Sequence, residues 1–338
     1  MKRALFVVFA VLALGGFGAR YVFQILLNRP GPPLAAPIRI DVAAGEPFRT
    51  TATKLEEAGL VPSARALVLW ARLEAIDRQI QQGAYQFSSP LTPIALVEKM
   101  RSGEAMIIHV LLPEGATARD LALTLEHNGF GPAPRFLALA RDGAFARSLR
   151  VPADGLEGYL YPDTYFFSPL DSAQKILGMF VARFHQVFTP DLEAEAWKAG
   201  FTVHQIVTLA SVIEKETGRE EERPLVSAVF RNRLRQGMPL QADPTVIYGI
   251  ENFDGNLTRR DLETPTPYNT YTAPGLPAGP IGNPGRSALL AALRPADVPY
   301  LYFVARDDGS HEFNSSLAEH NRAVNRYQRS RHARAQAG

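Results

Sequence analysis

Two glutamates lie at the end of a predicted amphipathic helix, in residues 210–217, which read Ala-Ser-Val-Ile-Glu-Lys-Glu-Thr. Glu214 follows a run of apolar residues, and a carboxyl group held against apolar surface loses hydration of its charged form, so its pKa rises. Such a group can act as a general acid near neutral pH. Glycosidic bonds need this acid, because the leaving sugar oxygen must be protonated. Glu214 is therefore a candidate acid for glycoside cleavage.

The helix that positions Glu214 has well-marked predicted ends. Thr202 and Gln205 have the spacing of a capping box at its start, and Gly218 stands where a glycine commonly closes a helix. At about 100° per residue, the apolar face admits both Glu214 and Glu216, so the pattern does not choose between them. A helix end whose charges are simply solvated is the alternative.

Other segments carry residues suited to binding sugars. Residues 155–165 contain three tyrosines and two acids, and aromatic rings stack on the apolar faces of sugars. Residues 264–285 contain six prolines and four glycines, which predicts a long irregular loop of the kind that is usually functional or disordered. Tyr268, Asn269 and Tyr271 in this loop favour a binding wall. The alternative for both segments is turns that only pack.

A weak internal repeat precedes these segments. Residues 45–60 align with residues 115–130, and each copy combines an extended apolar stretch, a glycine turn and an amphipathic helix. In the second copy, Thr117 and Asp120 have the spacing of a capping box. Such units resemble LysM modules, which are small folds that bind N-acetylglucosamine polymers. A subdomain that only supports the rest of the chain is the alternative.

The N-terminus predicts a membrane anchor. Lys2 and Arg3 precede an apolar run over residues 4–19, and residues 21–27 extend it beyond Arg20. This length suits one tilted transmembrane helix, with the basic start in the cytoplasm and the remainder exported. The small residues near the end of the apolar run leave a cleaved signal peptide as the alternative.

Composition excludes several classes of protein. The net charge is +2, from 36 basic and 34 acidic residues, and no basic run is interleaved with aromatics, which argues against nucleic acid as a partner. Cysteine is absent, so disulfides and thiolate sites are excluded. The seven histidines lack the spacing of a zinc site, and neither a serine-nucleophile motif nor a phosphate loop occurs. We therefore expect neither a metal nor a cofactor.

Five sequence blocks together resemble one family. They are residues 157–164, 210–217, 240–249, 261–285 and 311–314. In these blocks the chain is similar to the endolytic murein lytic transglycosylases, the YceG-like or MltG family, and the resemblance extends from the N-terminal segment to Asn321.

The resemblance implies an enzyme that cuts the β-1,4 bond from N-acetylmuramic acid to N-acetylglucosamine within peptidoglycan strands, nascent strands among them, and so ends their polymerisation. It also implies 1,6-anhydro ends, association with peptidoglycan synthases, and a catalytic domain outside the plasma (inner) membrane, in the periplasm. The family's catalytic residue is the first glutamate of its Glu-Lys-Glu-Thr motif, which is Glu214 here. Further residues expected to bind substrate are Glu157, Tyr159, Gln241, Asp243, Thr245, Tyr268, Asn269, Tyr271 and Asn314.

Two other functions stay open. A hydrolytic muramidase would pair Glu214 with a second carboxylate about 5–9.5 Å away, for which Glu157, Asp243 and Glu216 are available. A scaffold without catalysis would bind the cell wall through the LysM-like part.

The sequence as a whole predicts an α+β protein with a transmembrane helix, a LysM-like βααβ subdomain and a mixed catalytic domain. The expected divisions are an anchor in residues 1–28, a linker in 29–37, the LysM-like subdomain in 38–108, the catalytic domain in 109–332 and a disordered tail in 333–338.

Overall fold

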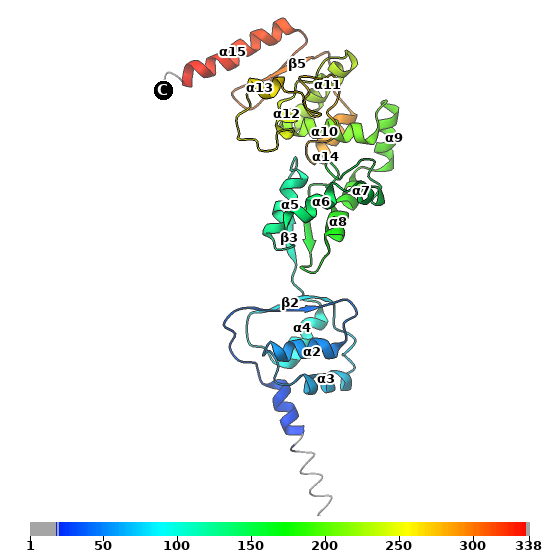
Figure 1. Ribbon diagram of the computed structural model, residues 1–338, viewed down its shortest axis with the longest axis vertical. Coiled ribbons are helices and arrows are strands. Elements are labelled where there is room, and N and C mark those ends of the chain that lie inside the picture. Colours follow the sequence, from blue (N-terminus) through cyan, green and yellow to red (C-terminus); the bar gives the residue numbers. More distant parts are fainter. Residues whose placement is uncertain (1–17, 19, 336–338) are drawn as a thin grey trace, which may run out of the picture. The chain divides into compact units, whose positions relative to one another are not determined.

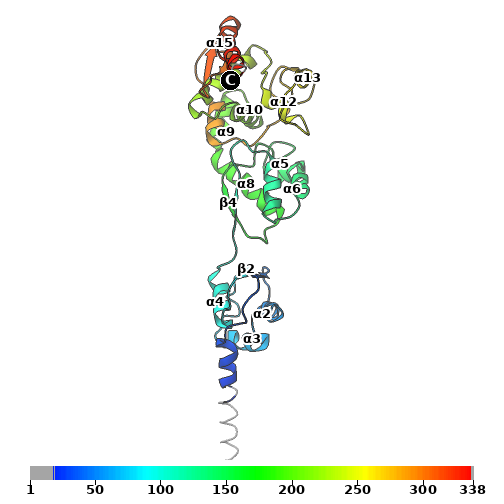
Figure 2. The same cartoon turned by 90° about the vertical axis from the view of Figure 1, so that its left-hand side faces the viewer.

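The computed structural model describes residues 18 and 20–335, and the chain divides into two compact units (Figures 1 and 2). Unit 1 comprises residues 1–109 and 166–171, and unit 2 comprises residues 110–165 and 172–338. Helices predominate, and the described strands pair in two-stranded sheets. This mixed composition agrees with the α+β class expected from the sequence.

The predicted transmembrane helix falls mostly on residues 1–17 and 19, which lie outside the described residues, as do residues 336–338 of the predicted tail. Among the residues that the structure describes, no helix is both long enough and apolar enough to cross a membrane.

Unit 1 packs helices against an antiparallel pair of strands. Its elements are β1 (Ile38–Val42), α2 (Phe48–Glu57), α3 (Ala64–Leu73), β2 (Gly83–Phe87) and α4 (Pro93–Ser102). β1 and β2 pair with Ile40 opposite Tyr85, and the core between strands and helices includes the fully buried Leu55 and Leu67. The order β1, α2, α3, β2 is the expected βααβ order, whereas the likeness to LysM stays a prediction.

Unit 2 contains the remaining elements. Its first part has β3 (Ile108–Leu111), α5 (Ala118–His127), α6 (Ala133–Ala140), α7 (Gly143–Ser148), β4 (Thr164–Phe167), α8 (Ala173–Val187), α9 (Pro190–Lys198) and α10 (Val203–Glu216). Its second part has the 3₁₀ turn η1 (Glu220–Glu222), α11 (Arg223–Arg235), α12 (Asp243–Tyr248), α13 (Arg259–Glu263), α14 (Arg286–Leu293), β5 (Tyr302–Ala305), β6 (His311–Asn314) and α15 (Leu317–Ala335). β3 pairs with β4, and β5 pairs with β6; the division between the units falls inside β3 and β4.

Helix α10 is the central element of unit 2. Its residues from Ile206 to Ile213 are all buried, and it packs against α9, α11, α12 and α14, which surround it in Figure 1. The predicted capping box is confirmed, because Thr202 and Gln205 bond to each other's backbone N–H groups. Gly218 stands at the predicted C′ position, because α10 ends at Glu216 and Thr217 is its C-cap in extended conformation (φ −142°), but Gly218 is not among the glycines with positive φ. The Thr217 hydroxyl instead accepts from the Arg219 N–H, which directs the chain away from the helix.

The long proline-rich segment is irregular, as expected, and one buried side chain fixes its end. Asn283 is fully buried, and its amide donates to the Ala116 carbonyl (2.8 Å) and the Glu157 carboxylate (3.1 Å) while accepting from the Leu160 N–H (2.9 Å). Its backbone N–H donates to Ala116, and its carbonyl accepts from Gly115. Asn283 therefore joins three segments that are distant in sequence.

We expect Asn283→Ala to lower the free energy of unfolding of unit 2 by about 2–4 kcal/mol, because it leaves the buried Leu160 N–H without its acceptor and removes one donor each from the Ala116 carbonyl and the Glu157 carboxylate. Hydrogen exchange of the buried α10 amides measures this loss. Asn256→Ala, at an exposed asparagine of the same unit, is the matched control and should change little. Equal protection in the two variants would contradict the role of Asn283.

Candidate active site

The Glu214 carboxylate is held by two donors from different helices. Arg223, the first residue of α11, donates from Nη2 to Oε1 at 2.6 Å. The backbone N–H of Gly285, the N-cap of α14, donates to Oε2 at 2.9 Å. The Glu214 side chain is only 5% exposed, so both bonds act where water screens charge poorly.

Burial raises the pKa of Glu214. The Gly285 N–H and the Arg223 guanidinium act in the opposite direction by stabilising the carboxylate, and the nearby Glu114 carboxylate adds to the rise. Glu214 therefore combines an elevated pKa with donors that stabilise its charged form. A carboxyl group that has to give a proton and then accept one needs both properties.

Glu216 lies in a second cluster of polar residues. Burial, together with the Asp243 carboxylate, raises the pKa of Glu216 to about 8, although the Arg233 guanidinium acts in the opposite direction. The Tyr271 hydroxyl donates to Asp243 Oδ1 at 2.5 Å, and Arg233 Nη1 donates to Gln241 Oε1 at 3.3 Å. The structure thus brings the predicted residues Gln241, Asp243 and Tyr271 to Glu216 rather than into contact with Glu214.

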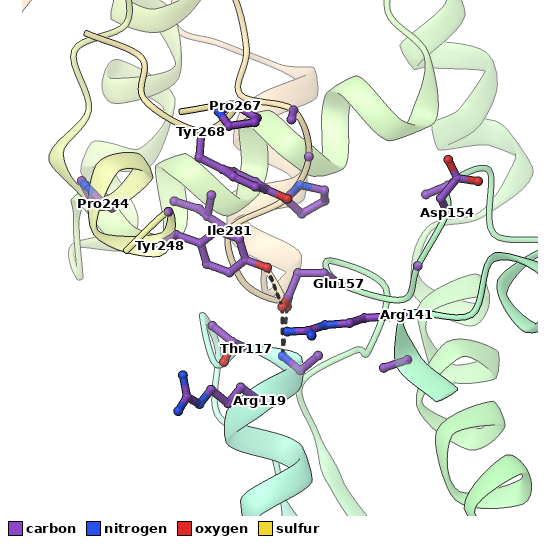
Figure 3. Close-up of a pocket in the computed structure, with 18 of the residues that line it drawn as sticks. Thr117, Arg119, Arg141, Asp154, Glu157, Pro244, Tyr248, Pro267, Tyr268 and Ile281 are labelled. Atoms are coloured by element: carbon purple, nitrogen blue, oxygen red, sulfur yellow. Dashed lines mark hydrogen bonds between the residues drawn. The ribbon is translucent and has the colours of Figure 1, made fainter. Parts of the chain in front are cut away.

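Glu157 lies in the wall of a pocket of about 1250 Å³ within unit 2, with Tyr248 and Tyr268 (Figure 3). The Tyr248 hydroxyl and the Ala118 N–H, which begins α5, both donate to the Glu157 carboxylate (each 3.0 Å), as does Asn283. Burial raises the pKa of Glu157 to about 7, although the Ala118 N–H and the Tyr248 hydroxyl oppose the shift. The rings of Tyr248 and Tyr268 meet edge to face, with 4.8 Å between their centroids.

The pocket lies next to the residues around Glu214. Lys215 lines it, and Glu214 and Lys215 both pack against Gly115: a Cβ at that position would lie 3.4 Å from Glu214 Cγ and 3.7 Å from Lys215 Cδ. Gly115 also has φ +75°, a conformation that favours glycine.

The other predicted binding residues are buried and bonded within the protein. The Tyr159 hydroxyl lies 3.0 Å from His204 Nδ1, and the Thr245 hydroxyl donates to the Ala242 carbonyl. The Asn269 amide donates to three carbonyls at 2.7–3.2 Å, which shapes the loop. Asn314 lies buried in β6. Direct contact of these four side chains with glycan stays a prediction.

Sequence reasoning missed Glu114, Arg223, Tyr248 and Asn283. Glu114, Tyr248 and Asn283 act across long sequence separations, so no local spacing identified them. Arg223 lies nine residues after Glu214, but in the sequence it follows a run of three acids and looks like part of a solvated surface. Within residues 18 and 20–335, no group of three or more histidine, aspartate or glutamate side chains is placed to hold a metal ion.

The elevated pKa of Glu157 predicts a pH-dependent stability. The folded protein binds a proton at Glu157 up to about pH 7, whereas the unfolded chain releases it near 4.5, so stability falls as pH rises between these values. In urea titrations at pH 4.5 and 8, Glu157→Gln should remove up to about 3 kcal/mol of that fall. Glu251→Gln, an exposed acid of the same pocket, should retain the wild-type dependence. The same slope in wild type and Glu157→Gln would contradict this account.

Comparison with known proteins identifies the family. The model of the YceG-like family matches residues 40–326. An endolytic murein transglycosylase of Bacillus subtilis is 30% identical over 305 residues, which cover 86% of this chain and 84% of the relative. A Streptococcus pneumoniae protein of the same name is 28% identical, and the match covers 94% of this chain but 64% of that longer relative.

A solved structure agrees with this result. The crystal structure of a yceG-like protein from Listeria monocytogenes is 30% identical in sequence, with a TM-score of 0.59. The match covers 86% of this chain and 99% of that one. The chain therefore belongs to the YceG-like family.

Proposed function

We infer that this protein is a peptidoglycan lytic transglycosylase. The relatives that cover most of the chain are named endolytic murein transglycosylases. The observation within the molecule that carries the inference is Glu214, a nearly fully buried carboxyl group with a raised pKa. It also stands at the position of the glutamate that the family motif marks as catalytic.

The proposed reaction uses one carboxyl group twice. Protonated Glu214 gives its proton to the oxygen that leaves with N-acetylglucosamine while the bond from that oxygen to the muramic C1 breaks. The resulting carboxylate then takes the proton of the muramic 6-hydroxyl, whose oxygen bonds to C1 and closes the 1,6-anhydro ring. The donors from Arg223 and Gly285 stabilise the carboxylate between the two transfers.

The surroundings of the other acids support a lyase over a hydrolase. Glu157 accepts hydrogen bonds from three donors of the protein itself, and Asp243 accepts one from Tyr271. Because three donors occupy most of its acceptor positions, Glu157 is poorly disposed to activate water in place of the sugar hydroxyl. No observation favours a scaffold without catalysis.

We place one part of the glycan strand in the pocket lined by Glu157, Tyr248 and Tyr268. Its volume of about 1250 Å³ is larger than the range of about 300–1,000 Å³ that is usual for small-molecule sites. The tyrosine rings offer stacking surfaces for sugars, and Lys215 connects this wall to Glu214 through their common packing on Gly115. The roles of Gln241, Asp243, Thr245, Asn269, Tyr271, Asn314 and Tyr159 in binding are proposals of the same kind.

Substitution of the acid tests the assignment. Glu214→Gln keeps the size of the side chain but cannot give or take the proton, so we expect cleavage of purified peptidoglycan to fall by at least about 10³-fold. Glycan pull-down should stay intact. Glu216→Gln is the matched control from the same helix end and should retain cleavage. If Glu214→Gln still cuts while Glu216→Gln does not, the acid is Glu216.

We also propose that the N-terminal segment anchors the protein in the membrane beside peptidoglycan synthases, so that it cuts nascent strands outside the plasma membrane. Apolar side chains at the described end of this segment, Tyr21, Val22 and Ile25, are exposed, as lipid-facing residues would be. Cell fractionation with crosslinking should find the full chain in membranes with a synthase, and a variant lacking residues 1–29 should lose both. Equal recovery of the two forms would contradict the anchor.

A further inference from the structure

Arg223 lies between two carboxylates. Its Nη2 is 2.6 Å from Glu214 Oε1 and 3.5 Å from Glu114 Oε2. The side chains of Arg223 and Glu214 are almost completely buried, at 8% and 5% exposure, whereas that of Glu114 is half exposed at 49%. One guanidinium nitrogen therefore has a buried partner and an alternative partner at the surface.

This arrangement matters for the protonation of Glu214, on which two requirements of the proposed function conflict. A general acid must carry its proton when substrate is bound, yet a buried guanidinium at hydrogen-bond distance favours the carboxylate. If Glu214 were protonated with Arg223 as its only neighbour, a buried cation would lose its counter-charge, which is costly. With Glu114 present, the guanidinium keeps a negative partner while Glu214 holds its proton.

Gly285 leaves room for the carboxylates of both Glu114 and Glu214 beside the Arg223 guanidinium. Its N–H donates to Glu214, and a Cβ at residue 285 would overlap the Glu114 carboxylate. Glu114 is itself fixed by the chain that follows, because the Gly115 N–H donates to the Asn283 carbonyl at 2.8 Å. The two acids and the guanidinium are thus held by backbone geometry.

We propose that Glu114 is a positioning residue for the reaction. The Arg223 guanidinium pairs with Glu114 when Glu214 is protonated, and it pairs with Glu214 again when Glu214 becomes a carboxylate. The inference rests on the proposed function for its role in catalysis. The underlying electrostatic link between Glu114 and Glu214 belongs to the folded protein whether or not it cuts glycan.

Several other titratable groups lie around Arg223, Glu214 and Glu114. Lys215 faces Glu214, and Tyr161 faces Glu114. A cavity of about 420 Å³ beside Arg223 is also lined by Glu114, Glu220, Arg286 and Arg294, and Arg294 is already paired with Glu195 at 2.8 Å. Among the described residues, Glu114 is the acid of this cavity that pairs with the guanidinium, so Glu220 is a suitable control.

The test is a titration of Glu214 in the full chain. Glutamate labelled with ¹³C at the side-chain carboxyl gives a signal for Glu214 that is identified by its loss in Glu214→Gln. We expect Glu114→Gln to lower the pKa of Glu214 by about one unit, so that about tenfold less of it is protonated at pH values above the pKa. Glu114→Asp should largely restore the wild-type titration, and Glu220→Gln should leave it unchanged.

Cleavage assays on the same variants read out the catalytic part. The alkaline limb of kcat/KM against pH should move to lower pH in Glu114→Gln, with about a tenfold loss at pH values well above the pKa of Glu214 and little loss well below it. A uniform loss at every pH, or an unchanged Glu214 titration, overturns the proposal. If Glu114→Gln does not fold, Arg223→Gln is the second variant. It should raise the pKa of Glu214, because it removes the cation that stabilises the carboxylate, and an unchanged pKa would overturn the proposal. If the wild-type chain does not cleave peptidoglycan, the proposed function is refuted. The titration would still decide whether Glu114 and Glu214 are linked electrostatically.

Discussion

The hydrogen bonds of one buried amide determine the geometry on which the site depends. Asn283 is the last polar residue of a long proline-rich segment, and it bonds to the backbone of residues 115, 116 and 160 and to the Glu157 carboxylate. Two residues later, the Gly285 N–H points at Glu214. A buried amide needs all of its hydrogen-bond partners. The segments around residues 115, 160 and 283 can therefore meet in only one alignment, and this alignment sets the positions of Glu157 and Glu214.

The two acids show how burial and hydrogen bonding divide their roles. Glu157 is surrounded by donors from the start of α5, from Tyr248 and from Asn283, which suits a group that organises a pocket wall. Glu214 has fewer partners, and one of them, Arg223, has an alternative partner in Glu114. A group whose partner can move is better suited to proton transfer than one that is fully satisfied.

Local rules predicted much of the fold, and contacts between distant residues explain what they missed. The capping boxes at Thr117 and Thr202 depend on neighbouring residues, and the structure has them. Gly218 stands at the predicted C′ position, but the bond between Thr217 and Arg219, rather than a left-handed glycine, shapes the chain after the helix end. The helical wheel could not choose between Glu214 and Glu216 as the catalytic acid. The two side chains differ in their hydrogen-bonding and charged partners, which come from α11, α12 and α14. Arg223 and Glu114 are 109 residues apart, and no spacing in the sequence links them.

The central claim is that the sugar's own hydroxyl, rather than water, completes the cleavage begun by Glu214. Digestion of purified peptidoglycan in H₂¹⁸O, followed by mass spectrometry of the muramic ends, tests it directly. The account predicts 1,6-anhydro ends that contain no ¹⁸O. Reducing ends that carry ¹⁸O would contradict it, because they would mean that water attacks and that a second carboxylate has to activate it.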